Sequence, residues 1–193
     1  QPSIMAIMLE QAALKPGMHV LEIGAGTGYN AALIAAIVGA RGHVTTLDID
    51  DDLIAAARDH LAAAGMADRV TAIRADGWAG YTLNAPYDRI LLSVQARDLS
   101  PAWVESLKPG GRIVLPLDVW AGAQLSVAFV KKAAALVSAS VVPCGFMPLR
   151  GESAAEPGEM VWIGDHDRGI GQLTPTHTLE SWDRLTRLDY NSY

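Results

Sequence analysis

A glycine-rich stretch near the N-terminus places the strongest constraint on how this chain folds. Residues 21–30 read LEIGAGTGYN, between the apolar run HVLEI at 19–23 and the alanine-rich YNAALIAAIVG at 29–39. Because glycine tolerates backbone conformations that other residues avoid, the pattern predicts a tight turn between a buried strand and a helix. Such a turn usually holds a nucleotide-like ligand, whose identity must come from the rest of the chain.

The rest of residues 1–150 alternates between strand and helix patterns. Further helices are expected at 2–14, 51–65 and 101–107. Further strands are expected at 43–49, 69–76, 87–94 and, after a turn KPGG, at 112–117. This alternation indicates βαβ units and a mostly parallel sheet. Two last strands, 124–131 and 135–144, are joined by a short basic turn and must be antiparallel. We therefore predict an α/β fold with a mostly parallel seven-stranded sheet that ends in an antiparallel hairpin.

Residues 151–193 have a different character from residues 1–150. GESAAEPGE at 151–159 is typical of a linker, and no periodicity is sustained after it. We predict a ligand-binding domain over 1–150 and a C-terminal extension over 151–193, which is a lid, a fragment of a second domain or a flexible end. GDHD at 164–167 is interpreted as a solvated loop, so no metal site is predicted.

Charge and composition narrow the classes of partner. The formal net charge is -6 with a pI of about 5.3, and no basic face of the kind that binds nucleic acid is visible. The longest apolar runs have about ten residues, whereas a membrane span needs about 20. Cys144 is the single cysteine, which excludes an intramolecular disulfide and fits a reducing compartment. We predict a cytoplasmic protein with neither nucleic acid nor membrane as partner, and leave its oligomeric state open.

The spacing of the glycines decides between several nucleotide-like ligands. A dinucleotide turn reads G-x-G-x-x-G, which would require glycine at position 29, where this chain has tyrosine. A P-loop is excluded because no Lys-Ser or Lys-Thr pair follows. The loop also has no basic residue that would neutralise a diphosphate.

The G-x-G-x-G spacing resembles the first motif of class I S-adenosylmethionine-dependent methyltransferases. ADG at 75–77, PYDRILLS at 86–93 and LKPGGRIVLP at 107–116 resemble later motifs of these enzymes and follow in the same order. The resemblance implies a Rossmann-like fold with helices on both faces of the sheet. It also implies S-adenosyl-L-methionine as cofactor and S-adenosyl-L-homocysteine as product.

The same resemblance implies a set of cofactor-binding residues. Asp48, followed by Ile49, ends the second strand, where a carboxylate can accept hydrogen bonds from both ribose hydroxyls. Asp76 and Gly77 would meet the adenine, and Trp78 either flanks the adenine or packs in the protein. The amino-acid and ribose side would be lined by Gly24, Ala25, Gly26 and Gly28, with Glu22 beneath.

Two flanking stretches resemble one branch, the protein-L-isoaspartate O-methyltransferases. QPSIMAIMLE at 1–10 is similar to the segment that follows their substrate-site serine, and GFMPLRG at 145–151 is similar to their closing motif. The serine would lie just before Gln1. We therefore expect native sequence to precede Gln1 and to contribute a hydroxyl-bearing residue to the acceptor side.

The branch implies methylation of an Asp or isoAsp carboxylate in a peptide or protein, which leads to succinimide and isoaspartate chemistry. The resembling family normally ends soon after this motif, whereas about 40 residues remain here. Longer relatives tailor ribosomal peptides, so repair and tailoring both stay open. A carboxylate is ionised at neutral pH and needs no general base. Ser93 is a candidate donor to that carboxylate, or a strand-end serine bonded to backbone. Alternatives are a small-molecule O- or N-methyltransferase, which would need a base or metal, and a cofactor-binding scaffold without activity.

Overall fold

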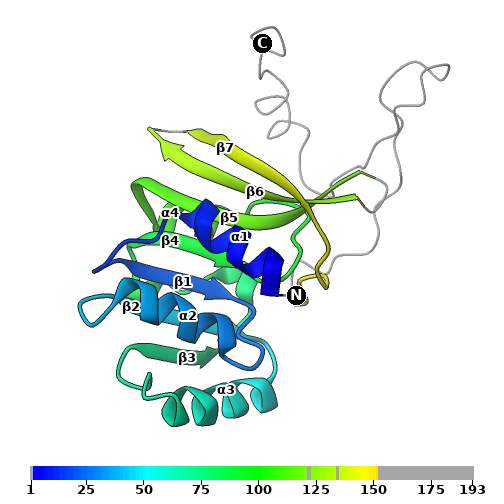
Figure 1. Ribbon diagram of the computed structural model, residues 1–193. Helices are drawn as coiled ribbons and strands as arrows, with labels where there is room; N and C mark the ends of the chain where they lie inside the picture. The colour runs from blue at the N-terminus through cyan, green and yellow to red at the C-terminus, as the bar shows by residue number, and fades with distance from the viewer. Residues whose placement is uncertain (1, 121–122, 134, 152–193) are drawn as a thin grey trace, which may run out of the picture. The chain divides into compact units, whose positions relative to one another are not determined.

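The computed structural model describes residues 2–120, 123–133 and 135–151. The predicted extension over 151–193 and the GDHD sequence therefore lie, apart from Gly151, outside the described residues. Within the described ranges the chain forms a seven-stranded sheet with the order β3-β2-β1-β4-β5-β6-β7 (Figure 1). The strands are β1 His19–Ile23, β2 His43–Asp48, β3 Val70–Arg74, β4 Tyr87–Leu92, β5 Leu107–Trp120, β6 Ala123–Lys132 and β7 Ala135–Cys144.

The strand directions confirm the predicted architecture. β1 to β5 pair in parallel, while β6 is antiparallel to both β5 and β7. The sheet is thus mostly parallel and ends in the antiparallel hairpin of β6 and β7.

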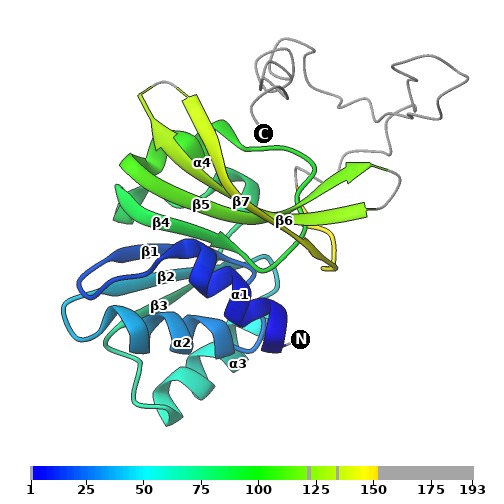
Figure 2. The ribbon, with the colours of Figure 1, turned by 45° about the horizontal axis from the view of Figure 1, so that its top comes forward.

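Helices cover both faces of the sheet, as predicted. The helices are α1 Pro2–Ala12, α2 Tyr29–Val38, α3 Asp51–Ala63 and α4 Pro101–Ser106, with 3-10 turns η1 Gly77–Ala79 and η2 Thr82–Asn84. α1, α2 and α3 lie on one face and α4 on the other (Figure 2). Among the described residues, no helix is long and apolar enough to cross a bilayer.

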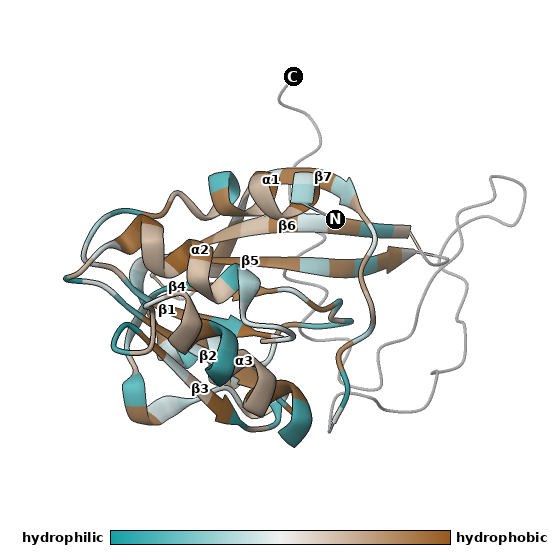
Figure 3. Ribbon diagram, turned by 60° about the horizontal axis from the view of Figure 1, so that its bottom comes forward, coloured by the Kyte–Doolittle hydropathy of each residue, from teal (hydrophilic) through white to brown (hydrophobic). Residues whose placement is uncertain are grey.

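Side chains that point alternately to the two faces of the sheet explain why there is a core on each face. Val20 joins the core under α1, α2 and α3, whereas its neighbours Leu21 and Ile23 join the core that contains Trp103 of α4. Successive strand residues point to opposite faces, so strands buried on both faces must be apolar throughout. Figure 3 shows hydrophobic colouring along the central strands and mixed colouring on α3.

β5 is longer than the sequence predicted. The KPGG residues, expected as a turn before the strand, lie inside it. Tyr87 of β4 pairs with Leu107, yet Arg89 pairs with Arg112, so β5 carries extra residues over this interval. The two glycines lie in this irregular interval, and parallel pairing continues on both sides of it.

The position of β1 creates the place for a ligand. β1 pairs with β2 on one side and with β4 on the other. The chain leaves β1 toward β2 and β3, and later returns to extend the sheet from β4. The loops after β1 and β4 therefore diverge, and ligands bind in the crevice at such a switch point.

Two arginines from the sheet hold the C-terminal end of α1. Arg89 of β4 donates to the carbonyl oxygen of Ala12 and, over 3.2 Å, to that of Ala13. Arg112 of β5 donates to the carbonyl of Gln11 over 2.9 Å. The last carbonyls of a helix need external partners and attract positive charge. α1 is therefore fixed on the sheet by contacts at the end opposite to the ligand crevice.

Replacing Arg89 with methionine should destabilise the chain by about 1–3 kcal/mol, because the buried carbonyl of Ala12 and the half-buried carbonyl of Ala13 lose their donor. Urea unfolding measures this difference. The exposed Arg41→Met is the matched control, and should change stability by less than about 0.5 kcal/mol. Equal stabilities for the two variants would contradict the role of Arg89 in holding the end of α1.

Candidate active site

A pocket of about 480 Å³ opens at the carboxyl ends of the central strands. It lies at the switch point between β1 and β4, where the fold is expected to hold a ligand. Six of the residues predicted from the sequence line it: Gly24, Gly26, Asp48, Ile49, Gly77 and Ser93.

The glycine loop is shaped by close approach and by backbone conformation. The amides of Gly24 and Ala25 both donate to the carbonyl of Leu47 over 2.8 Å, which ties the loop to β2. A Cβ on Gly24 would lie 2.5 Å from the Ser93 Oγ, so no larger residue fits there. Gly26 has a φ of +50°, and a Cβ on it would meet nothing within 4 Å. Its backbone therefore borders open space, as required for the close approach of a bulky ligand.

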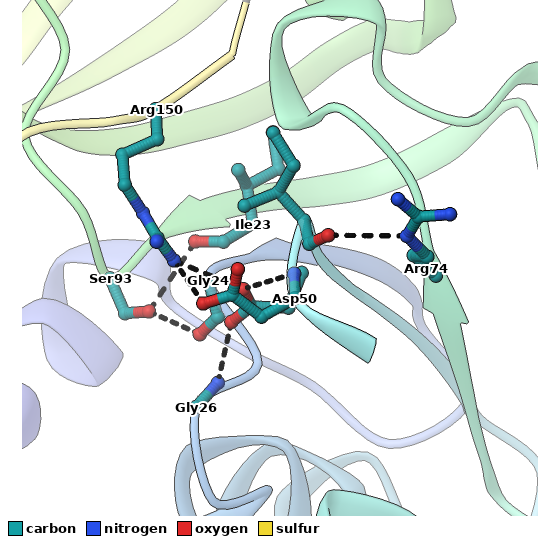
Figure 4. A network of polar contacts seen from close by, with 9 residues as sticks. Ile23, Gly24, Gly26, Asp50, Arg74, Ser93 and Arg150 are labelled. Atoms are coloured by element: carbon teal, nitrogen blue, oxygen red, sulfur yellow. Dashed lines mark hydrogen bonds and ion pairs between the residues drawn. The ribbon is translucent and has the colours of Figure 1, made fainter. Parts of the chain in front are cut away.

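Among the described residues that line the pocket, Asp48 supplies the carboxylate. Its Oδ2 accepts a hydrogen bond from the Gly26 amide over 3.0 Å, and its Oδ1 lies 3.4 Å from the Asp50 amide (Figure 4 draws this network). Its side chain is only 9% exposed. The carboxylate is thus held by backbone amides and keeps acceptor capacity for ligand hydroxyls.

Glu22 lies beneath the loop rather than in the pocket lining. Its Oε1 accepts from Asn30 Nδ2 over 2.7 Å, and its Oε2 accepts from Thr46 Oγ1 over 2.5 Å. Complete burial raises the pKa of Glu22 to about 7, although the hydrogen bonds from Thr46 and Asn30 oppose the shift and Asp48 adds to it. This carboxyl group therefore connects β1, β2 and the first turn of α2.

Other predicted residues also lie behind the pocket surface. A Cβ on Gly28 would be 3.2 Å from the carbonyl oxygen of Ala57, so Gly28 allows the loop to approach α3. Asp76 Oδ1 accepts from the Trp78 amide over 2.9 Å and caps η1. The Trp78 ring packs edge-on against the Trp103 ring, with 5.3 Å between the ring centroids. Trp78 thus packs on Trp103, and its adenine-flanking role stays a prediction.

Ser93 uses its hydroxyl on backbone. Oγ donates to the carbonyl of Gly24 over 2.5 Å and lies 3.3 Å from that of Ile23. A serine has one hydroxyl hydrogen, so donating to an acceptor carboxylate would require the hydroxyl to rotate. The observed contact anchors the glycine loop to the end of β4. The acceptor-side role of Ser93 stays a prediction.

One segment of the pocket was missed as a site by the sequence reasoning. Residues 145–151, called the strap here, include the six lining residues Gly145, Phe146, Met147, Pro148, Leu149 and Arg150. Gln95, after β4, donates to the carbonyl of Met147 and accepts from the amide of Leu149, each over 2.7 Å. Gly151 packs directly against the Asp76 carboxylate. The signal was present in the GFMPLRG motif, which the resemblance had singled out without giving it a role.

Glu22 should make the stability of the chain depend on pH. Folding raises the pKa of this carboxyl group from 4.5 to about 7. The group therefore contributes most to the stability of the folded state below pH 4.5, and this contribution is lost as the pH rises toward 7. Glu22→Gln removes the ionisation and keeps the size. Between pH 5 and pH 8 the variant should therefore gain up to about 3 kcal/mol relative to the unmodified chain.

Urea unfolding at several pH values measures this gain. The exposed Glu10→Gln is the control and should follow the pH profile of the unmodified chain. A Glu22→Gln profile that runs parallel to both would show that Glu22 is ionised throughout the range.

Known proteins are similar to the part of the chain that forms the sheet and its helices. The sequence profile of the family Protein-L-isoaspartate(D-aspartate) O-methyltransferase matches residues 1–154. The chain is 43% identical over 158 residues to a protein-L-isoaspartate O-methyltransferase of Hyperthermus butylicus, covering 78% of this chain and 66% of the relative. It is 38% identical over 148 residues to one of Ignicoccus hospitalis, covering 77% and 70%.

Solved structures are also similar to this chain. A protein-L-isoaspartate O-methyltransferase superimposes with a TM-score of 0.75 at 33% identity, over 79% of this chain and 48% of the other. A Plasmodium falciparum protein solved with S-adenosyl-L-homocysteine shares the fold, with a TM-score of 0.68 at 18% identity over 77% and 74%. The chain thus spans about half to three quarters of the length of these proteins. Since the family profile matches most of this chain, and the fold and the motifs around the pocket agree with it, the chain belongs to the protein-L-isoaspartate(D-aspartate) O-methyltransferase family.

Proposed function

We propose that this chain transfers a methyl group from S-adenosyl-L-methionine to the carboxylate of an isoaspartyl residue in a peptide or protein. The observation that carries the proposal is the open approach at Gly26 beside the amide-bound carboxylate of Asp48, in a chain of this family. The cytoplasmic location predicted from the sequence is part of the same proposal.

The cofactor would lie across the carboxyl ends of β1, β2 and β3. Gly24 and Gly26 would border its amino-acid and ribose side, and Asp48 would accept hydrogen bonds from the ribose hydroxyls. Ile49 and Gly77 line the pocket beyond Asp48, on the side proposed for the adenine. Asp76 stays the proposed partner of the adenine amino group, with Trp78 behind it.

Methyl transfer to a carboxylate requires little from the protein beyond the placement of the cofactor and the acceptor. S-adenosyl-L-methionine would supply a sulfonium methyl group. A carboxylate oxygen would form a bond to this methyl as the carbon–sulfur bond breaks, which releases S-adenosyl-L-homocysteine. The acceptor is already ionised, so the chain needs no general base. Its pocket walls are largely apolar; they include Ile23, Leu47, Leu53, Val94, Phe146 and Leu149. Orientation of the two partners then accounts for most of the rate enhancement.

Replacing Asp48 with alanine should weaken S-adenosyl-L-homocysteine binding by about 1–3 kcal/mol, because both ribose hydroxyls lose their acceptor. Calorimetry measures the dissociation constant. Asp48→Asn keeps one acceptor oxygen and should lose less, while the exposed Asp59→Ala should bind normally. An unchanged dissociation constant for Asp48→Ala would rule out this placement of the ribose.

The product should be a methyl ester. Mass spectrometry of an isoaspartyl peptide incubated with the full chain and S-adenosyl-L-methionine should show the gain of about one methylene group. Mild alkali should reverse the gain or convert the peptide to a succinimide. The same peptide with ordinary aspartate is the control and should react poorly. Reaction with several unrelated isoaspartyl peptides would favour repair over the tailoring of one precursor, and an alkali-stable product would sink the carboxylate assignment.

A further inference from the structure

The strap brings a positive charge to the ribose end of the pocket. Among the described residues that line the pocket, Arg150 carries the positive charge and Asp48 the negative one. Figure 4 shows the Arg150 side chain extending from the strap toward Asp50, which follows β2. The residues proposed for the cofactor do not include Arg150, so its role is open.

Asp50 fixes the position of the guanidinium. Arg150 Nη2 lies 2.5 Å from Asp50 Oδ2, and it lies 3.9 Å from Asp48 Oδ1. The first contact is a charge-assisted hydrogen bond, whereas the second is too long to be one. A guanidinium has five N–H donors in a planar fork. Bonding to Asp50 therefore leaves donors that can serve another partner near Asp48.

The separation between Arg150 and Asp48 suits a hydroxyl group. An oxygen about 2.8 Å from each of two polar atoms 3.9 Å apart makes an angle close to a right angle between them. A hydroxyl donates one hydrogen bond and accepts others. It can therefore donate to the Asp48 carboxylate and accept from the Arg150 guanidinium at the same time.

The strap backbone is placed well enough to support such a contact. Leu149, the residue before Arg150, donates its amide to the carbonyl of Gln95. Gly151, the residue after it, packs against Asp76. The Arg150 side chain itself is 57% exposed, so it can adjust when a ligand enters.

We propose that Arg150 is a cofactor-positioning residue that completes the ribose site, donating to the hydroxyl oxygen whose hydrogen Asp48 accepts, with Asp50 as its anchor. The inference rests on the proposed function and adds a partner that its ribose site lacks. A bound ribose then bridges the glycine loop, β2 and the strap, so the nucleoside helps to hold the strap over the pocket.

A cycle of two ligands and matched variants tests the proposal. The probes are S-adenosyl-L-homocysteine and its 2′,3′-dideoxy analogue, measured by calorimetry on the full chain. Arg150→Met keeps an apolar stem but removes the donors, and should weaken S-adenosyl-L-homocysteine about three- to tenfold. The same substitution should weaken the dideoxy analogue less than about twofold. Asp50→Asn should reproduce part of this selective loss, and the exposed Arg97→Met should show none.

The outcomes separate this inference from the proposed function. If the unmodified chain binds S-adenosyl-L-homocysteine and Arg150→Met weakens both ligands equally, or neither, the inference is overturned and the proposed function stands. If the unmodified chain does not bind S-adenosyl-L-homocysteine, the proposed function falls and the inference falls with it.

Discussion

The parallel pairing of β1 with both β2 and β4 determines where every other part of the site lies. β1 is buried between its two neighbours as far as Ile23, and the glycine loop begins with the next residue. The turn is made by glycines tied to the Leu47 carbonyl, and their backbone faces the crevice between the diverging loops. Asp48 is aligned beside this turn because β2 runs parallel to β1 and ends at the same edge.

Two carboxyl groups near the loop have opposite environments. Glu22, on β1, is fully buried, and desolvation raises its pKa to about 7. Asp48, one strand away, accepts from backbone amides and borders the pocket. The first group therefore connects the elements beneath the loop, whereas the second is presented to a ligand. The two environments follow from the positions of the residues on their strands. Glu22 points to the face covered by α2, while Asp48 ends its strand at the crevice.

The sequence predicted what local spacing determines. Gly24, Gly26, Asp48 and Gly77 each lie at a set distance from a strand end, so their place in the pocket lining could be predicted from the sequence. The partners of Ser93 and Trp78 could not, because they depend on contacts between Ser93 and Gly24 and between Trp78 and Trp103, far apart in sequence. The prediction of KPGG as a turn before the strand was wrong for a similar reason, since an irregular interval inside a strand and a turn before it can contain the same residues.

The strap shows why long-range parts of a site escape local reasoning. Its residues follow β7, the last strand of an antiparallel edge, yet main-chain bonds to Gln95 carry them back to the centre of the sheet. No periodicity in GFMPLRG indicates that return. It is encoded by the complementary surface, namely the segment after β4, the Asp76 carboxylate against Gly151 and the acidic start of α3 opposite Arg150. A site that needs placement more than acid–base chemistry gains most from such a segment, because one strand-like stretch supplies apolar walls and a charged contact to elements that are otherwise separate.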